Sequence, residues 1–174
     1  MKPYENINMN AENIASTIYN NIGEEMPSLF SLLKWIEENL GIKIEIFYSE
    51  NSLAKMHCSG LVHSEPTISG YRIWMNSKDF KFRQNFTECH EIGHIIRNMS
   101  LKYKFSTGEI YSKWGEERFC DRFAAAFLMP AKLFIYKWNA IKEPIYLKKA
   151  RLANTFKVSG QAVYYRAKEL KLIC

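Results

Sequence analysis

Two histidines four residues apart, the first followed by a glutamate, constrain this chain of 174 residues more than any other feature. They occur in the segment His90–His94, which reads HEIGH and lies in a stretch, residues 79–98, that we expect to be one helix. Side chains at positions i and i+4 of a helix lie one above the other, so His90 and His94 can present two imidazole nitrogens to one Zn²⁺ ion. Glu91 lies about 100° further round the helix, where its carboxylate can contact a metal-activated water rather than the metal. This pattern is typical of a zinc hydrolase.

A structural alternative stays open for this helix, because its histidines can be hydrogen-bonded side chains without a metal. A catalytic zinc site keeps three protein ligands, so a third is expected downstream. Glu117 and Asp121 share one face of the next expected helix, residues 114–129, which Pro130 closes. There Glu117 can bind the metal while Asp121 accepts the free ring N–H of a ligating histidine. A solvated glutamate in the first helical turn is the alternative, and it fits Glu116 better than Glu117.

The order of the expected elements predicts an α+β fold with a small three-stranded sheet packed on helices. The three strands follow one another closely, which favours antiparallel pairs. Residues 101–113 are polar and aromatic and are expected to form a long loop. The expected elements, in order, are helices at residues 9–22 and 28–40, strands at 42–48, 53–63 and 71–76, and helices at 79–98, 114–129, 131–139, 147–155 and 159–170.

Composition excludes several classes of protein. With 47% apolar and 24% charged residues, the chain resembles ordinary globular proteins and is too apolar to be mostly disordered. It has no run of 18 apolar residues and no apolar segment near its first residue, so we expect neither a membrane-spanning helix nor a secretory signal. The four cysteines form no C-x-x-C pair, and we expect reduced thiols in a cytoplasmic protein.

The net charge of +6 is unevenly distributed along the chain. Residues 1–130 carry 14 basic and 16 acidic side chains, whereas residues 131–174 carry ten basic and two acidic ones. We therefore expect a core, residues 1–130, followed by a basic helical module, residues 131–174. In this module two short helices are joined by a turn, and Ser159 is suited to cap the second. Such a module either contacts DNA phosphates or packs against protein with its charges solvated, and the sequence leaves both open.

Several motifs together resemble those of the ImmA/IrrE metallopeptidases. Residues Phe86–His94 are similar to the family signature F-T-x-x-H-E-x-G-H, and residues Glu117–Pro130 are similar to its segment E-x-x-x-N/D-x-F-A-x-x-L-L-M-P. Asn76 matches an asparagine that ends a strand in the family. Residues 151–172 resemble the helix-turn-helix segment L-A-x-x-F-x-V-S-x-x-A-x-x-x-R that often follows the family's peptidase core.

The resemblance implies a zincin-like metallopeptidase fold and a gluzincin-like site. Carried over by position, it implies that His90, His94 and Glu117 bind Zn²⁺, that Glu91 is the general base, and that Asp121 supports a ligating histidine. The implied activity is that of a zinc-dependent endopeptidase that cleaves a helix-turn-helix repressor and so derepresses its target genes. The alternative is a regulator that binds DNA or a repressor and whose metal site is structural or vestigial.

The chain departs from the family pattern at two positions of the second motif. Many members have a second glutamate two residues after the ligand and then an alanine, where this chain has Phe119 and Cys120. Glu117 stays the aligned ligand, although the neighbouring Glu116 leaves room for a shift by one residue.

Other polar or reactive residues have structural explanations at least as good as functional ones. A histidine in a weak strand is more often hydrogen-bonded than catalytic, and a cysteine nucleophile needs exposure and a lowered pKa. Gly93 weakens its helix by about 1 kcal/mol relative to alanine, so we expect it to admit another backbone or the substrate. The residues in question are His57 and His63, the packing candidates Cys89 and Cys120, and three guesses for an oxyanion stabiliser, Arg97, Tyr103 and Tyr111.

Overall fold

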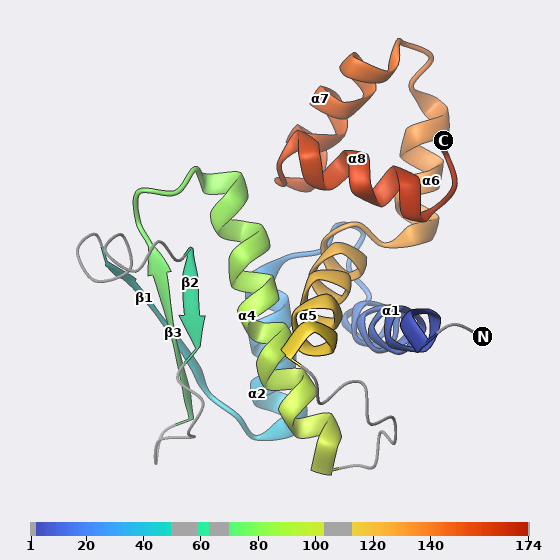
Figure 1. Ribbon diagram of the computed structural model, residues 1–174. Coiled ribbons are helices and arrows are strands. Elements are labelled where there is room, and N and C mark those ends of the chain that lie inside the picture. The colour runs from blue at the N-terminus through green and yellow to red at the C-terminus, as the bar shows by residue number, and fades with distance from the viewer. Residues whose placement is uncertain (1–2, 50–58, 63–69, 103–112, 174) are drawn as a thin grey trace.

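The computed structural model describes the chain except for residues 1–2, 50–58, 63–69, 103–112 and 174. Within the described residues, seven helices and a three-stranded sheet confirm the predicted α+β class (Figure 1). No helix in this part of the chain is long and apolar enough to span a membrane. The elements are α1 (Pro3–Ile22), α2 (Leu29–Leu40), β1 (Ile44–Ser49), β2 (Gly60–Val62), β3 (Tyr71–Asn76), α4 (Lys81–Lys102), α5 (Lys113–Leu128), α6 (Ala131–Ala140), α7 (Ile145–Phe156) and α8 (Gly160–Glu169).

Helix α2 shows how short-range sequence sets the limits of an element. Ser28 is extended, and its hydroxyl accepts a hydrogen bond from the N–H three residues later, which satisfies a donor left free at the helix start. Gly41 ends the helix in the left-handed conformation with φ of 66°, and its N–H donates to the carbonyl of Glu37. Leu32 and Ile36, one turn apart, are fully buried and form the apolar stripe of this helix.

The sheet has the order β1-β3-β2, and its pairing corrects the expectation of antiparallel strands alone. Strand β2 pairs antiparallel with β3, but β1 pairs parallel with β3. Two parallel strands need a crossover connection, and here the residues between β1 and β3 include β2 on the far side of β3. The central strand β3 is thus covered on both edges, while β2 is an edge strand that packs against α4.

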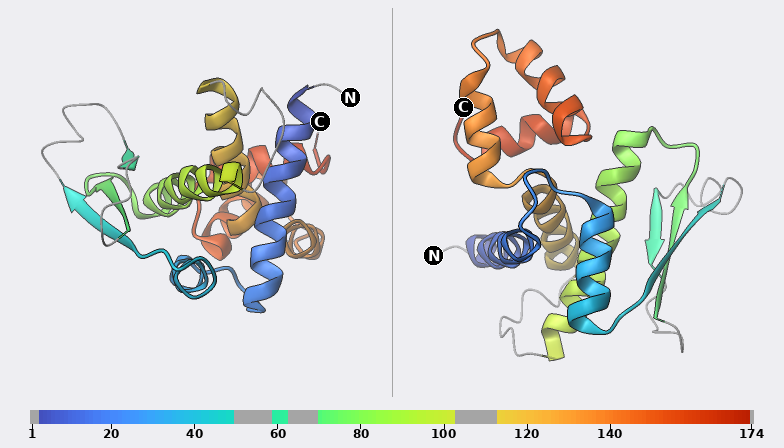
Figure 2. Two further views of the ribbon diagram at one scale, coloured as in Figure 1. Left: turned by 90° about the horizontal axis from the view of Figure 1, so that it is seen from below. Right: turned by 180° about the vertical axis from the view of Figure 1, so that it is seen from behind.

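Helix α4 is the centre of the core. The sheet lies on one of its sides, and α5 with α1 lies on the other (Figure 1, Figure 2). Ile92 and Ile95 of α4 and Phe123 of α5 are fully buried there, and burying each such side chain contributes about 1.5–3 kcal/mol. Gly93 allows the close approach of the two helices, because a Cβ at this position would lie 3.1 Å from the Cα of Cys120. The neighbour that Gly93 admits is therefore the backbone of α5.

Helices α6 to α8 form the basic part of the chain and pack on the end of the core nearest the start of α4 (Figure 1). Ser159 caps α8 as predicted, since its hydroxyl accepts a hydrogen bond from the N–H of Ala162 at 3.1 Å. Phe134 packs between Trp138 and Phe156, with ring centroids 5.9 and 5.6 Å apart. The boundary at residue 130 stays a proposal.

A buried ion-pair network joins α8 to the core. Arg166 is fully buried, and its two terminal nitrogens donate to the carboxylate of Glu12 on α1 at 2.7 and 2.8 Å. Its Nε donates to the carbonyl of Met129 at 2.9 Å. Arg122 of α5 also pairs with Glu12, at 2.9 Å, and with Glu169 of α8. One of the ten basic residues of the module is thus engaged inside the protein.

Glu12 makes this network sensitive to acid. Burial by itself raises the pKa of its carboxyl, but the hydrogen bonds and charges of Arg166 and Arg122 lower the pKa below its usual value. A carboxyl with a lowered pKa stabilises the folded state above its unfolded pKa, about 4.3, and this contribution is lost as the pH falls through the folded value. We expect Glu12→Gln to destabilise the protein more at pH 7 than at about pH 3. Urea unfolding at both pH values measures this, and an equal loss at both would contradict it.

Candidate metal centre

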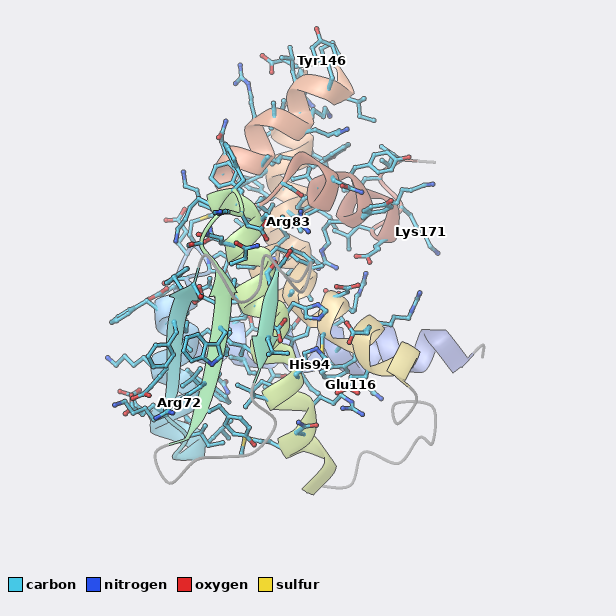
Figure 3. The ribbon with its side chains drawn as sticks, turned by 60° about the vertical axis from the view of Figure 1, so that its left-hand side comes forward. Arg72, Arg83, His94, Glu116, Tyr146 and Lys171 are labelled. Carbon is cyan, nitrogen blue, oxygen red and sulfur yellow. The ribbon has the colours of Figure 1, made fainter. Side chains whose placement is uncertain are left out.

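The packing of α4 against α5 brings the predicted site residues onto facing surfaces. His90 and His94 lie one turn apart on α4, with ring centroids 5.0 Å apart. Their side chains are only 15% and 14% exposed. Figure 3 shows His94 beside Glu116, where α4 and α5 meet. The two rings are therefore held between the helices while one side stays accessible.

Each imidazole ring is held at Nδ1 by a carboxylate from α5. His90 Nδ1 lies 2.8 Å from Asp121 Oδ1, and His94 Nδ1 lies 3.1 Å from Glu116 Oε1. A carboxylate at Nδ1 keeps the proton on that nitrogen and leaves the Nε2 lone pair for a metal ion. Asp121 thus contacts His90, and its role beside a ligating histidine stays a prediction. The expectation that Glu116 is a solvated first-turn residue is wrong, because its carboxylate contacts His94.

Glu117 faces the other nitrogen of both rings. Its Oε2 lies 3.3 Å from His90 Nε2, and its Oε1 lies 3.8 Å from His94 Nε2. Two imidazoles and one carboxylate that converge in this way are a donor set of catalytic zinc sites. The side chain of Glu117 is 52% exposed, so this side of the centre is open to solvent. The residues present therefore fit a zinc ion with a position left for water or substrate.

The Asp121 carboxylate also acts on the charge state of His90. Burial by itself lowers the pKa of this imidazole, but the hydrogen bond to Asp121 and the neighbouring negative charges raise it above its usual value. A proton and a metal ion compete for the same ring nitrogen.

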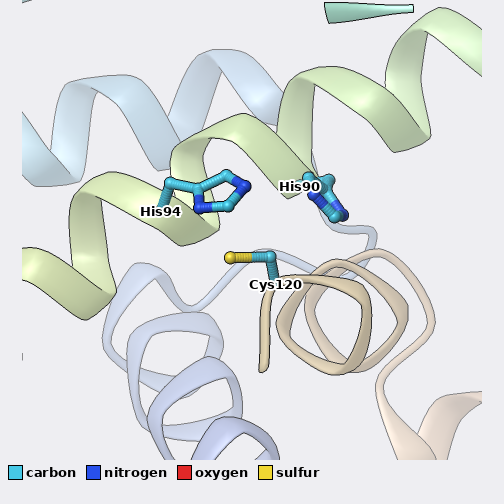
Figure 4. Close-up of side chains that lie close together, drawn as sticks. All are labelled: His90, His94 and Cys120. Atoms are coloured by element: carbon cyan, nitrogen blue, oxygen red, sulfur yellow. The ribbon is translucent and has the colours of Figure 1, made fainter. Parts of the chain in front are cut away.

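Cys120 is a further donor that sequence reasoning treated only as a packing residue. Its Sγ and one nitrogen from each of His90 and His94 lie within 4.8 Å of one another (Figure 4). The thiol is fully buried, and burial raises its pKa, with the carboxylates of Glu117 and Glu116 raising it further. The thiolate is the form that binds metals, so this environment opposes ligation. The signal in the sequence was Cys120 itself, at a position where many family members have alanine.

Metal substitution separates the two candidates for the third ligand. We expect Glu117→Ala to weaken binding of Co²⁺ about tenfold or more, because it removes a donor to the ion. Cys120→Ala is expected to leave the affinity and the near-ultraviolet spectrum unchanged. Titration of the metal-free protein, followed by absorption, measures both. A thiolate-to-cobalt charge-transfer band that disappears in Cys120→Ala would instead assign Cys120 as a ligand.

A matched control for this experiment is Cys89→Ala. Cys89 is also fully buried, it directly precedes His90 on α4, and burial raises the pKa of its thiol. This environment is the opposite of what a nucleophilic cysteine needs. Replacing it tests whether a spectral change comes from a nearby buried thiol in general or from Cys120.

The side chain of Glu91, the predicted general base, lies between α4 and β2, an edge strand of the sheet. Glu91 is 8% exposed. A Cβ added at Gly60 would lie 3.0 Å from both Cγ and Oε1 of Glu91. The same Cβ would lie 2.7 Å from the side chain of Thr87. Gly60, at the start of β2, thus leaves room for the Glu91 carboxylate. Sequence reasoning had marked this glycine only as a bend or bulge.

Arg97, one of the three sequence candidates for an oxyanion stabiliser, contacts Glu116 instead. It is 6% exposed, and its Nη1 donates to Glu116 Oε1 at 2.5 Å and to Asn98 at 3.3 Å. Arg97 therefore orients the carboxylate that holds His94. The other residues singled out in the sequence, His57, His63, Tyr103 and Tyr111, lie outside the described residues.

A comparison with models of known protein families agrees with the geometry of the site. Residues 38–168 match the family model Peptidase_M78, the IrrE N-terminal-like domain. The chain belongs to this family. The match includes α4 and α5, which carry the candidate metal centre, and extends through α7 into α8. It confirms the resemblance to the ImmA/IrrE group.

A solved structure of a Mycobacterium tuberculosis transcriptional regulator is similar to this IrrE-like chain. The TM-score is 0.60 at 15% sequence identity, and the alignment covers 94% of this chain and 51% of the regulator. The chain thus spans about half the length of that protein, and the likeness concerns the fold alone. No curated protein sequence matches the chain.

Proposed function

We propose that the chain is a zinc-dependent endopeptidase whose active site is the centre between α4 and α5. One observation carries this proposal: the Nε2 atoms of His90 and His94 both face the Glu117 carboxylate, at 3.3 and 3.8 Å. A carboxylate behind each ring gives the orientation that a metal ligand needs. Membership of a metallopeptidase family supports the same activity.

Each of the site residues has a separate role in the proposed hydrolysis. His90, His94 and Glu117 would hold the zinc ion, which when bound supplies Lewis acidity that activates water and the peptide carbonyl. Glu91 accepts a proton from the attacking water and then donates it to the nitrogen of the leaving amine. Asp121 fixes the tautomer of His90 throughout. Since Glu91 is largely buried, few other water molecules compete for its carboxylate.

The proposed substrate is a helix-turn-helix repressor, whose cleavage would derepress its target genes in the cytoplasm. The resemblance to the ImmA/IrrE peptidases motivates this choice, and the solved structure similar in fold is named a transcriptional regulator. An extended segment of such a substrate can pair with the open edge of a sheet through main-chain hydrogen bonds. Strand β2 is the edge next to Glu91, so it is the strand that such a segment would extend.

Metal content and cleavage together test this function. We expect one zinc ion per chain, and cleavage of a helix-turn-helix repressor that stops with a chelator and returns with zinc. Gel electrophoresis and mass spectrometry identify the products. A protein that holds no stoichiometric metal, or that cleaves equally well with chelator present, would contradict the proposal.

DNA binding by α7 and α8 is the second candidate, with the basic surface of the module in its favour. The Arg151 side chain is 63% exposed, Lys168 is exposed and Lys149 is half-buried. The amino groups of both lysines lie over the ring of Tyr164, 5.3 and 5.8 Å from its centroid. Under this candidate, duplex binding falls steeply with salt, and charge reversal at Lys149 and Lys168 weakens it further. A gel-shift titration at 50 mM and 200 mM salt measures this. Absence of a shifted band at the lower concentration excludes this candidate.

A further inference from the structure

A pocket of about 400 Å³ opens beside the metal centre, between α4, α5 and α8. Its volume lies within the range of about 300–1,000 Å³ that is usual for ligand pockets. Arg83, which lines the pocket, lies at the end of α4 nearest α8 (Figure 3). Its apolar wall comes from all three helices and consists of Phe86, Ala125, Ala162 and Tyr165.

This pocket continues the surface that carries the metal ligands. Phe86 precedes His90 by four residues on α4, and Ala125 follows Asp121 by four residues on α5, so each pair shares a helix face. Asp121 itself lines the pocket while holding His90. One helical turn is about 5.4 Å, and an extended peptide advances about 3.3 Å per residue. Phe86 and Ala125 therefore lie about one helical turn from His90 and Asp121, a separation that one or two residues of an extended peptide can span.

The charged groups that line the pocket are already engaged with other groups. Arg166 binds Glu12, Glu169 pairs with Arg122, and Asp121 binds His90. Arg83 pairs with Asp79 at 3.5 Å, and Lys168 lies 5.8 Å from the ring centroid of Tyr164. These partners reduce what the charged groups offer to an occupant. What the pocket offers to an incoming group is mainly its apolar wall.

We propose that this pocket receives a large apolar side chain of the peptide substrate, one or two residues from the scissile bond. The inference rests on the proposed peptidase function and adds a specificity element to it. Since Ala162 and Tyr165 belong to α8, the basic module forms one wall of the substrate site. The module then contributes to substrate recognition through its packing as well as through its charge.

Binding of small probes tests the pocket without any cleavage. In the zinc-loaded protein with Glu91→Gln and labelled alanine methyl groups, we expect N-acetyl-phenylalanine amide to shift the signals of Ala125 and Ala162 in a saturable way. N-acetyl-glycine amide is expected to shift neither signal. Ala126, fully buried elsewhere in the core, is the internal reference. Absence of a saturable shift at both pocket methyls overturns the proposal.

Filling the pocket tests its role in specificity. Ala162→Trp is expected to abolish probe binding and to lower kcat/KM for peptides with leucine or phenylalanine at the selected position about tenfold or more. Ala150→Trp, on the exposed surface of α7, is the matched control and is expected to change neither. Tyr165→Ala covers the case in which Ala162→Trp fails to fold, because this side chain is 55% exposed, and it is expected to weaken probe binding.

A random peptide library separates failure of the pocket from failure of the peptidase. Cleavage with no preference for apolar residues near the bond, or with a preference that Ala162→Trp leaves unchanged, overturns the pocket and leaves the peptidase intact. Probe binding that is lost in Ala162→Trp, together with no cleavage of the library or of a helix-turn-helix repressor, supports the pocket and contradicts the peptidase function.

Discussion

Under the proposed function, we expect Glu91→Gln to lower kcat/KM for peptide cleavage about 10²–10⁴-fold and to leave the binding of one zinc ion intact. Glutamine keeps the size of the side chain and so fits in the space that Gly60 leaves over Glu91. It removes the carboxylate that accepts the proton from water, which corresponds to about 2.7–5.5 kcal/mol of transition-state stabilisation. Steady-state kinetics and metal analysis of the same preparation measure both quantities.

Glu88→Gln is the matched control for this change. Glu88 lies three residues earlier on α4, is 6% exposed, and accepts a hydrogen bond from Tyr48 at 3.5 Å. Loss of a buried carboxylate from the same helix is expected to leave kcat/KM within about twofold of the wild type. Full activity of Glu91→Gln, or equal losses in the two variants, would remove Glu91 from its proposed role.

We expect Arg166→Met to destabilise the folded protein by about 3–5 kcal/mol, because it breaks a buried pair, leaving Glu12 with Arg122 as its remaining cation and the Met129 carbonyl without this donor. Both oxygens of the Glu12 carboxylate lose a hydrogen bond, and so does the carbonyl of Met129. Methionine keeps most of the apolar stem of arginine, so the loss reports mainly on the ion pair. The free energy of unfolding in urea at pH 7, with the same zinc content in both proteins, measures the effect.

Arg151→Met provides the comparison for the Arg166 change. Arg151 also pairs with a glutamate, Glu143, at 2.6 Å, but its side chain is 63% exposed. Exposed pairs contribute about 0–1 kcal/mol, so we expect a small loss. Similar losses in the two variants would show that the buried network does not hold α8 to the core.

Most helices and strands were predictable because their signals lie within a few residues. The helix expected at 28–40 occurs at Leu29–Leu40, since a serine cap, an apolar stripe and a terminal glycine are all local. The strand expected at 71–76 occurs at Tyr71–Asn76. The first helix starts earlier than expected, at Pro3, because its polar first turns carry little apolar periodicity.

The pairing of the strands was not predictable in the same way. Close spacing along the chain favoured antiparallel neighbours, but β1 lies beside β3 and runs parallel to it. This arrangement leaves β2 at the edge of the sheet, where Gly60 lies over Glu91. Which strands become neighbours depends on how the sheet covers α4, and that contact joins residues far apart in the chain.

Spacing along one helix was sufficient to place His90 and His94 on a common face with Glu91 beside them, because helical geometry repeats every 3.6 residues. The same reasoning named Glu117 as the third ligand, left Glu116 open as a shift by one residue and treated Cys120 as a packing residue, although these side chains leave α5 in different directions. The answer depends on how α5 lies against α4, and Gly93 permits that approach. Packing directs Glu116 to His94 Nδ1, Glu117 to both Nε2 atoms and Asp121 to His90 Nδ1. The placing of both histidines on one face of α4 follows from local spacing, whereas their carboxylate partners on α5 and the neighbouring pocket arise from long-range packing that no short segment encodes.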